Sequence, residues 1–342
     1  MNTTIKTLQI SFILLVIGQI HLISQTSKFT FQRSKMGSPF VITVFADDSL
    51  ILLPIIEKVY LRVDTLNQIF SDYLESSEIN TVCQNAKIWQ PISNELHHVL
   101  KISEKANQMS EGAFDVTVGH IVKTWRKARK TKQMPENTIL QAALQKTGFK
   151  NIQIAVDSPL MRFHTEGVLL DFGGIVKGFA AQEVVDILTK NGFPYCLVDA
   201  GGDLVVGKKP RLIPTELDGW KIGVSLPNSD RKMMPYLLSI ENQAIATSGD
   251  MYQFFEHKGN RYSHIVNPKT GLGVTHQRNV TVIAPDGATA DWLATACSIL
   301  PIRKAKRLIK KYPHTALLIL ENKNGKIKSI QSSQFAKYFF LN

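Results

Sequence analysis

The stretch LLDFGGIVKGFAA, residues 169–181, organises the rest of this chain. An apolar run ends in an aspartate, two glycines follow, and a helical pattern begins at once. This order predicts a strand, a tight turn and a helix from Gly174 to Lys190. Glycines let the backbone approach a ligand closely, and the first N–H groups of a helix attract anions. With Lys177 one turn into the helix, the stretch indicates a site for an anion, most simply a phosphate or pyrophosphate. A plain strand-to-helix turn with a surface lysine is the simpler interpretation of these residues alone.

The stretch matches neither of the two common nucleotide-binding loops. A Walker loop needs Gly-Lys followed directly by Ser or Thr, whereas Lys177 is preceded by Val176 and followed by Gly178. A dinucleotide-binding loop needs spaced glycines, whereas Gly173 and Gly174 are adjacent. A phosphate site here would therefore belong to another family.

Composition indicates a globular protein with one large domain or two ordinary ones. The chain has 342 residues, of which 44% are hydrophobic and 20% charged, and its formal net charge is +12. Part of this charge lies in residues 303–311, where lysines and arginines alternate with apolar residues at helical spacing. That pattern is typical of the solvated face of an amphipathic helix, and without an aromatic platform it does not indicate a nucleic-acid partner. Cys196 and Cys297 lie in apolar patterns and are predicted to be core residues.

The N-terminus indicates an exported protein. A mostly apolar run from Leu8 to Ile23 is short for a membrane-spanning helix and is interrupted by polar residues. We interpret residues 1–27 as a signal peptide or weak N-terminal anchor and residues 28–342 as the functional domain. The protein would then be periplasmic or attached to the outer face of the inner membrane. No cysteine follows the run as a lipid attachment site would require, so membrane association is left open.

Helices and strands alternate along the remaining chain without repeats or long linkers. Helical patterns cover residues 50–70, 95–109, 135–146, 288–300 and 302–311, and strands are predicted between them, among them one from Ser239 to Thr247. Residues 246–255 and 261–271 are predicted to be loops. The pattern places the fold in the α/β or α+β class, with two lobes around the central stretch.

Asp291 and Thr295 are four residues apart in a predicted helix. That spacing puts a carboxylate and a hydroxyl on one helix face. Both are hard oxygen donors of the kind that Mg²⁺ takes, with water and phosphate completing the octahedron. The alternative is an acid that favours the helix dipole beside an ordinary threonine.

His264 lies where a predicted strand runs into a turn at Asn267-Pro268. A histidine in such a position can act as a general base near neutral pH, although a surface or core histidine is the usual case. Residues 247–250, TSGD, could cap a helix or offer hydroxyls to a ligand.

The order of seven motifs is more specific than any one of them. Together they resemble the ApbE family of FAD:protein FMN transferases, over nearly all of the chain from Met36 to Ser298. The motifs are MGS (36–38), EGAFDVTVG (111–119), LDFGGIVKG (170–178), DAGGD (199–203), ATSGD (246–250), YSHIVNP (262–268) and ADWLAT (290–295).

The resemblance implies a two-lobed enzyme that holds FAD and Mg²⁺ between its lobes. It would transfer FMN from FAD to a threonine of an acceptor protein, such as a subunit of a redox complex, and release AMP. By similarity, His264 is the catalytic base, and Mg²⁺ is held by the carbonyl of Gly174 and by Asp291 and Thr295. The residues that by similarity line the FAD site are Met36, Tyr73, Ala113, Phe114, Asp115, Asp171, Lys177 and Ile265.

Two other functions fit the same residues. An FAD pyrophosphatase would use water as the nucleophile and give FMN and AMP, and a periplasmic flavin-binding protein would do no chemistry. Tyr73, at the position where transferases of the family usually have this aromatic, favours transfer. Asn267, where an aspartate is frequent, and Val176, where a smaller residue is common, depart from the family pattern.

Overall fold

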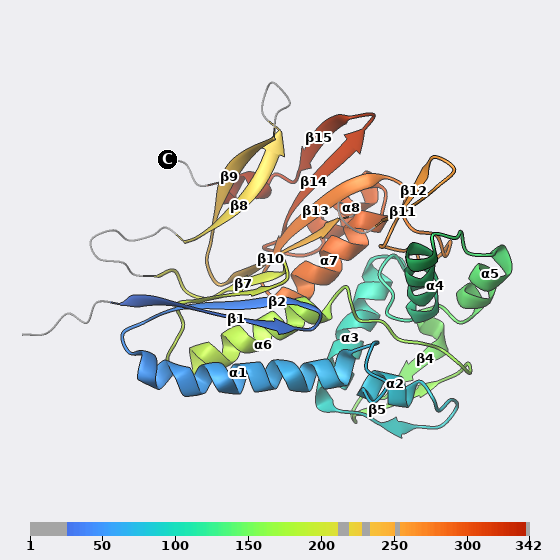
Figure 1. The fold of residues 1–342 in the computed structure, drawn as a ribbon, viewed down its shortest axis with the longest axis horizontal. Helices are drawn as coiled ribbons and strands as arrows, with labels where there is room; N and C mark the ends of the chain where they lie inside the picture. Colours follow the sequence, from blue (N-terminus) through green and yellow to red (C-terminus); the bar gives the residue numbers. More distant parts are fainter. Residues whose placement is uncertain (1–25, 211–218, 228–232, 250–253, 340–342) are drawn as a thin grey trace, which may run out of the picture.

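An eight-stranded antiparallel sheet forms the centre of the computed structural model, which describes residues 26–210, 219–227, 233–249 and 254–339 (Figure 1). Strands that are distant in sequence lie side by side in it, because the chain leaves the sheet after β2 and again after β7. In spatial order the strands are β1 (Ser27–Lys35), β2 (Ser38–Ala46), β6 (Cys196–Ala200), β7 (Leu204–Val206), β10 (Gln243–Gly249), β13 (Gln277–Ala284), β14 (Ala316–Lys323) and β15 (Lys326–Gln331).

Both faces of this sheet are covered. Helices α6 (Val176–Lys190) and α7 (Gly287–Ile299) pack on one face, with α1 (Ser49–Phe70) and α8 (Ile302–Lys310) beside them. The other face carries the β8–β9 hairpin (Trp220–Pro227 and Met233–Ile240) and a short 3₁₀ helix, η2 (Phe335–Tyr338). In β2, the side chains of Phe40, Ile42 and Val44 are completely buried in the core between the sheet and the helices. Phe45 instead packs in the core between the sheet and the β8–β9 hairpin. Alternating side chains thus fill both layers, as the two-residue period of a strand requires.

A second, smaller lobe stands beside the sheet (Figure 1). One of its cores surrounds the fully buried Trp125, which packs against α5 and the β11–β12 hairpin. The two-lobed α+β fold predicted from the sequence is therefore confirmed. The elements of this lobe are α2 (Glu78–Val82), β3 (Gln90–Pro91), α3 (Asn94–Met109), α4 (Gly119–Thr131), α5 (Asn137–Gln145), η1 (Phe149–Asn151), β4 (Ile152–Ile154), β5 (Leu160–Phe163), β11 (Phe254–His257) and β12 (Asn260–Ser263).

The predicted helices are present, and local capping explains where two of them begin. The side chain of Asp48 accepts a hydrogen bond from the N–H of Leu50 and caps the start of α1. The side chain of Asp286 accepts from the N–H of Thr289 and caps the start of α7. Helix α8 is amphipathic as expected: Ala305, Leu308 and Ile309 are buried and its basic residues are exposed. Cys196 and Cys297 are buried, as predicted.

Several predictions of secondary structure are wrong. Residues 168–172 form no strand, because this segment exchanges only isolated hydrogen bonds with residues 116–119. The predicted strand 239–247 is two strands, β9 and β10, because Asn242 adopts a positive φ of 48° and turns the chain. The sequence interpretation missed β1, α2 and α4, and parts of the two predicted loops are strands β10, β11 and β12.

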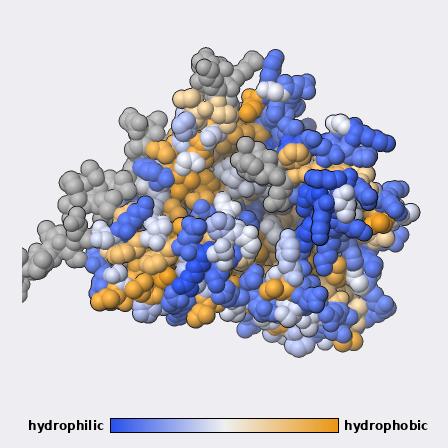
Figure 2. Space-filling model, viewed as in Figure 1, coloured by the Kyte–Doolittle hydropathy of each residue, from blue (hydrophilic) through white to orange (hydrophobic). Residues whose placement is uncertain are grey.

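The start of α1 exposes apolar side chains. Leu50 is 76% exposed and Ile51 65%, and Figure 2 shows apolar residues gathered over this corner of the molecule. No helix in the described part of the chain is both long enough and apolar enough to span a bilayer. The apolar run from Leu8 to Ile23 lies outside the described residues, so export stays a prediction, and Asp250 of the fifth motif also lies outside them.

Candidate functional site

A cavity of about 880 Å³ lies between the two lobes. That volume is at the upper end of the range for small-molecule sites. The structure brings all twelve residues predicted from the sequence to the walls of this one cavity, although they come from segments spread over 260 positions of the chain. They are Met36, Tyr73, Ala113, Phe114, Asp115, Asp171, Gly174, Lys177, His264, Ile265, Asp291 and Thr295.

Two helices cross at the floor of the cavity with their backbones in contact. A Cβ added to Gly178 of α6 would lie 2.0 Å from the carbonyl oxygen of Gly287, and a Cβ added to Gly287 would lie 2.0 Å from the oxygen of Gly178. The N–H of Gly178 also donates to Oδ2 of Asp291 at 3.2 Å. Glycine at both positions therefore sets how closely α7 approaches α6, and with it the position of the Asp291 carboxylate.

We expect Gly178→Ala to push α6 and α7 apart. Overpacking of this kind usually costs about 1–3 kcal/mol, so the midpoint of thermal unfolding should fall. Gly223→Ala is the control, since no atom lies within 4 Å of its added Cβ and its φ is not positive. A Gly178→Ala protein with unchanged stability would contradict this account of the crossing.

The three predicted metal donors lie together at this crossing. A Cβ on Gly174 would lie 2.9 Å from Oγ1 of Thr295, so these two residues are in close contact. Asp291 and Thr295 are both in α7, four residues apart as predicted. No group of three or more His, Cys, Asp or Glu side chains in the described residues could hold a metal ion. One carboxylate, one hydroxyl and one carbonyl are few ligands, a donor set that fits Mg²⁺, which keeps water and binds substrate phosphates.

Lys177 faces the carboxylates of this end of the cavity. Its Nζ lies 2.9 Å from Oδ2 of Asp203, which is buried. Burial alone would lower the pKa of Lys177, but the carboxylates of Asp203, Asp291 and Asp199 more than offset it and raise the pKa. Burial raises the pKa of Asp291 and the charge of Asp203 raises it further, while Lys177 opposes both. A cation beside Asp291 would relieve this crowding of negative charge.

One part of the anion-site prediction is wrong. The N–H groups at the start of α6 were expected to point at a ligand, but those of Ile175 and Val176 donate to the carbonyl of Phe172, and that of Gly178 donates to Asp291. The tight turn folds these donors back into the protein. Lys177 supplies a positive side chain at this end of the cavity.

His264 lies at the cavity on a loop that is fixed from several sides. It follows β12, and the N–H of the next residue, Ile265, donates to Oγ of Ser263 at 3.0 Å. The turn after it is closed by Asn267, whose Oδ1 accepts from the N–H of Lys269 at 2.9 Å. Asparagine is a common turn former, so its presence in place of the family's aspartate leaves the turn intact. Trp125 of α4 donates to the carbonyl of Gly271 and ties the loop to the smaller lobe.

Tyr73 is held from one side by an arginine that the sequence interpretation missed. The ring is 73% exposed, yet the guanidinium of Arg126 lies 4.1 Å from its centroid, and Arg126 in turn pairs with Asp72 at 2.8 Å. A stacked cation fixes the ring and leaves its other face open. Arg129, one turn along α4, also lines the cavity, and its Nη1 is buried without a hydrogen-bond partner among the described residues. Apolar residues at Ile121, Trp125 and Ala128 were the signal for this helix, and its arginines could have been assigned to the cavity only from the fold.

Asp115 and Asp171 support the cavity wall. Oδ1 of Asp115 accepts from the N–H and hydroxyl of Thr117, and Oδ2 accepts from Asn107 and the N–H of Phe149. Its oxygens are therefore largely used within the loop. Oδ1 of Asp171 accepts from the N–H of Gly173 at 2.8 Å. Burial raises the pKa of Asp171, and the nearby Asp72 carboxylate adds to this effect.

Sequence comparison assigns most of this chain to a known family. The profile of the ApbE family matches residues 36–319 of this chain. A Haemophilus influenzae protein named FAD:protein FMN transferase is 27% identical over 326 residues, which are 92% of this chain and 92% of that protein. A Treponema pallidum protein of the same name is 32% identical over 239 residues. That match covers 67% of this chain and 65% of the relative, just under two thirds of its length.

A solved structure has the same fold. The flavin transferase ApbE from Vibrio cholerae superposes with a TM-score of 0.79 and covers 92% of this chain and 99% of the other. The two sequences are 24% identical in this superposition, so the likeness shows the fold. Because the match covers 92% of this chain, the likeness extends over both lobes.

Proposed function

Because this chain belongs to the ApbE family, we propose that it is a Mg²⁺-dependent transferase that moves FMN from FAD to a threonine of an acceptor protein and releases AMP. One observation carries this proposal: Lys177, Asp291 and His264 line the same cavity. A cationic and metal-binding end suits the pyrophosphate of FAD, and a histidine at the same cavity suits a hydroxyl nucleophile.

The reaction breaks the phosphoanhydride bond of the FAD pyrophosphate and forms a phosphoester bond to threonine. The threonine oxygen attacks the phosphorus of the FMN half, and its proton passes to the imidazole of His264. The bond between that phosphorus and the bridging oxygen breaks, so AMP leaves with the bridging oxygen. Lys177 stabilises the negative charge that develops on the pyrophosphate oxygens, which is the main help that a phosphoryl transfer needs from a protein.

The residues at the helix crossing would hold the metal. Gly174, Asp291 and Thr295 supply oxygen ligands for Mg²⁺, which when bound neutralises charge on the phosphates. Asp203 keeps Lys177 charged and aligned toward this end of the cavity.

The other end of the cavity would receive a ring of FAD. The open face of Tyr73 offers a stacking surface for a planar ring, and Arg126 holds it in place. Nη1 of Arg129, which has no partner in the part of the chain that the structure describes, is a donor that an oxygen or nitrogen atom of the nucleotide could satisfy.

Purified protein with FAD and Mg²⁺ tests the proposal. With an acceptor protein present, we expect AMP to form in step with an acceptor whose mass increases by one FMN, located on a threonine by mass spectrometry. Without an acceptor, AMP should form slowly or not at all. Rapid release of FMN and AMP without an acceptor would identify a pyrophosphatase, and FAD that stays intact under every condition would identify a flavin-binding protein.

A further inference from the structure

A cluster of cations lies beside the cavity, where the loop that carries His264 meets the end of α3. Lys269 directly follows Pro268, which lines the cavity. The side chain of Lys269 crosses to the turn after α3, where its Cε lies 3.5 Å from the position of a Cβ on Gly112. The next residue of that turn, Ala113, also lines the cavity.

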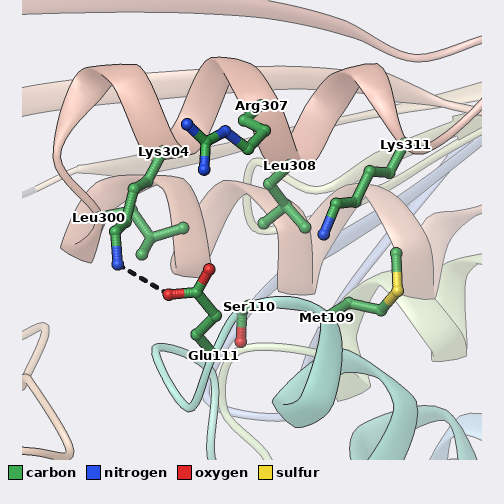
Figure 3. Close-up of a pocket in the computed structure, with 8 residues that line it drawn as sticks. All are labelled: Met109, Ser110, Glu111, Leu300, Lys304, Arg307, Leu308 and Lys311. Atoms are coloured by element: carbon green, nitrogen blue, oxygen red, sulfur yellow. Dashed lines mark hydrogen bonds and ion pairs between the residues drawn. The ribbon is translucent and has the colours of Figure 1, made fainter.

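Helix α8 adds three more cations at the same place. Lys304, Arg307 and Lys311 line a small pocket between α8 and the turn that carries Glu111. Figure 3 shows Lys304 and Lys311 reaching from α8 toward this turn. We call Lys269, Lys304, Arg307 and Lys311 the basic rim; all four residues are exposed.

Negative charge at the basic rim is scarce. Nζ of Lys304 lies 2.7 Å from Oε2 of Glu111, and both side chains are about half exposed. The hydrogen bond and charge of Lys304 lower the pKa of Glu111, and Lys269 and Lys311 lower it further. Glu111 is the one acidic residue among the described residues that line the small pocket, and residues 302–315 contain no acidic residue. An anionic partner would meet a strong local positive potential here.

The basic rim lies away from the start of the described chain. In Figure 1, β1 begins at the left of the molecule, whereas α8 and the β11–β12 hairpin that leads to His264 lie toward the right. The rim is therefore not beside the end to which the apolar N-terminal run is joined, and it is continuous with the cavity wall at Ala113 and Pro268.

We propose that the basic rim is the docking surface for an acidic segment of the acceptor protein, next to the threonine that receives FMN. The inference rests on the proposed function, because a second macromolecular substrate must bring a hydroxyl to His264. Attraction between opposite charges at the edge of a site speeds association and orients the partner. Salt screens this attraction. FAD binds deeper in the cavity and should not depend on the rim.

Two labelled peptides of equal length test the proposal, each with a central threonine, flanked by glutamates in one and by glutamines in the other. Their binding to the full protein is measured by fluorescence anisotropy across a salt series. The test variant is Arg307→Glu with Lys311→Glu. The control is Lys326→Glu with Lys328→Glu, which makes the same change of net charge at exposed positions of β15, away from the cavity.

We expect the glutamate peptide to bind the native protein more tightly than the glutamine peptide, and less tightly as salt rises. The test variant should lower its affinity by about tenfold, and the control by less than about twofold. Equal losses in both variants, or equal binding of the two peptides, would overturn the proposal. So would a test variant that loses binding to phosphatidylglycerol vesicles while it keeps the glutamate peptide, because the rim would then be a membrane surface.

FAD titration and AMP release separate this inference from the proposed function. Both variants should bind FAD as the native protein does, which shows that the cavity is intact. If the peptides behave as expected but the native protein never forms AMP from FAD with Mg²⁺ and an acceptor protein present, the proposed function fails and the rim remains a binding surface for acidic chains.

Discussion

Replacing His264 by alanine should lower FMN transfer to the acceptor by about 10²- to 10⁴-fold, the usual contribution of a general base. The side chain lies at the cavity on a loop fixed by Ser263, Asn267 and Trp125, so its removal should leave the fold in place. FAD affinity should change far less, because Lys177 and the Tyr73 wall do not depend on the imidazole. Single-turnover transfer and FAD titration on the same preparations measure the two effects.

His257 offers a matched control for this experiment. It lies in β11 of the same lobe and does not line the cavity, so His257→Ala should keep the native transfer rate. If His264 only packs against the bound flavin, affinity and rate would fall together in His264→Ala. A His264→Ala protein that transfers FMN at the native rate would rule out the base.

The second large effect is expected at Asp291. Asp291→Asn should lower transfer at saturating FAD by at least about 10²- to 10³-fold, the usual loss when a charge-stabilising group is removed from an active site. The amide keeps an oxygen that can accept from the N–H of Gly178, so the helix crossing should survive. The substitution also removes a buried carboxylate, whose pKa is raised by burial and by the charge of Asp203. Because a buried charge of this kind costs stability, the midpoint of unfolding should not fall. The Mg²⁺ concentration needed for half activity should rise sharply.

Asp286→Ala is the matched control, since it removes a carboxylate from the same helix. Asp286 caps α7 through the N–H of Thr289 and does not line the cavity. Its loss should cost about 1 kcal/mol of stability and leave the Mg²⁺ dependence unchanged. If Asp291→Asn keeps native activity at limiting Mg²⁺, the metal assignment is wrong.

Helices, and the spacing of residues within them, could be predicted from the sequence. The helices α1, α3, α7 and α8 follow from apolar spacing and capping residues, because helical periodicity and N-capping depend only on neighbours within four residues. The same locality placed Asp291 and Thr295 on one helix face. The resemblance to a family then named twelve residues, which the structure finds at one cavity.

Predictions failed where the outcome depends on a distant partner. Residues 168–172 have the composition of a strand but form no ladder, because the segment beside them supplies only isolated hydrogen bonds. The first N–H groups of α6 were expected to be free for a ligand, but a carboxylate from α7 takes one of them. Helix α4 was missed, and with it Arg126 and Arg129 at the cavity.

The amino-acid sequence by itself determined the local elements, the spacing of the oxygen donors in α7 and the membership in a family. Only the tertiary structure decided which segments meet. Gly178 and Gly287 are 109 positions apart, yet their backbones touch and thereby place Asp291 beside α6. Packing of distant segments also forms the ion pair of Lys177 with Asp203 and the stacking of Arg126 on Tyr73. It likewise places Glu111 beside Lys304 of the basic rim. The physical reason is that contacts between distant residues depend on how the whole chain packs, which no short stretch of sequence specifies.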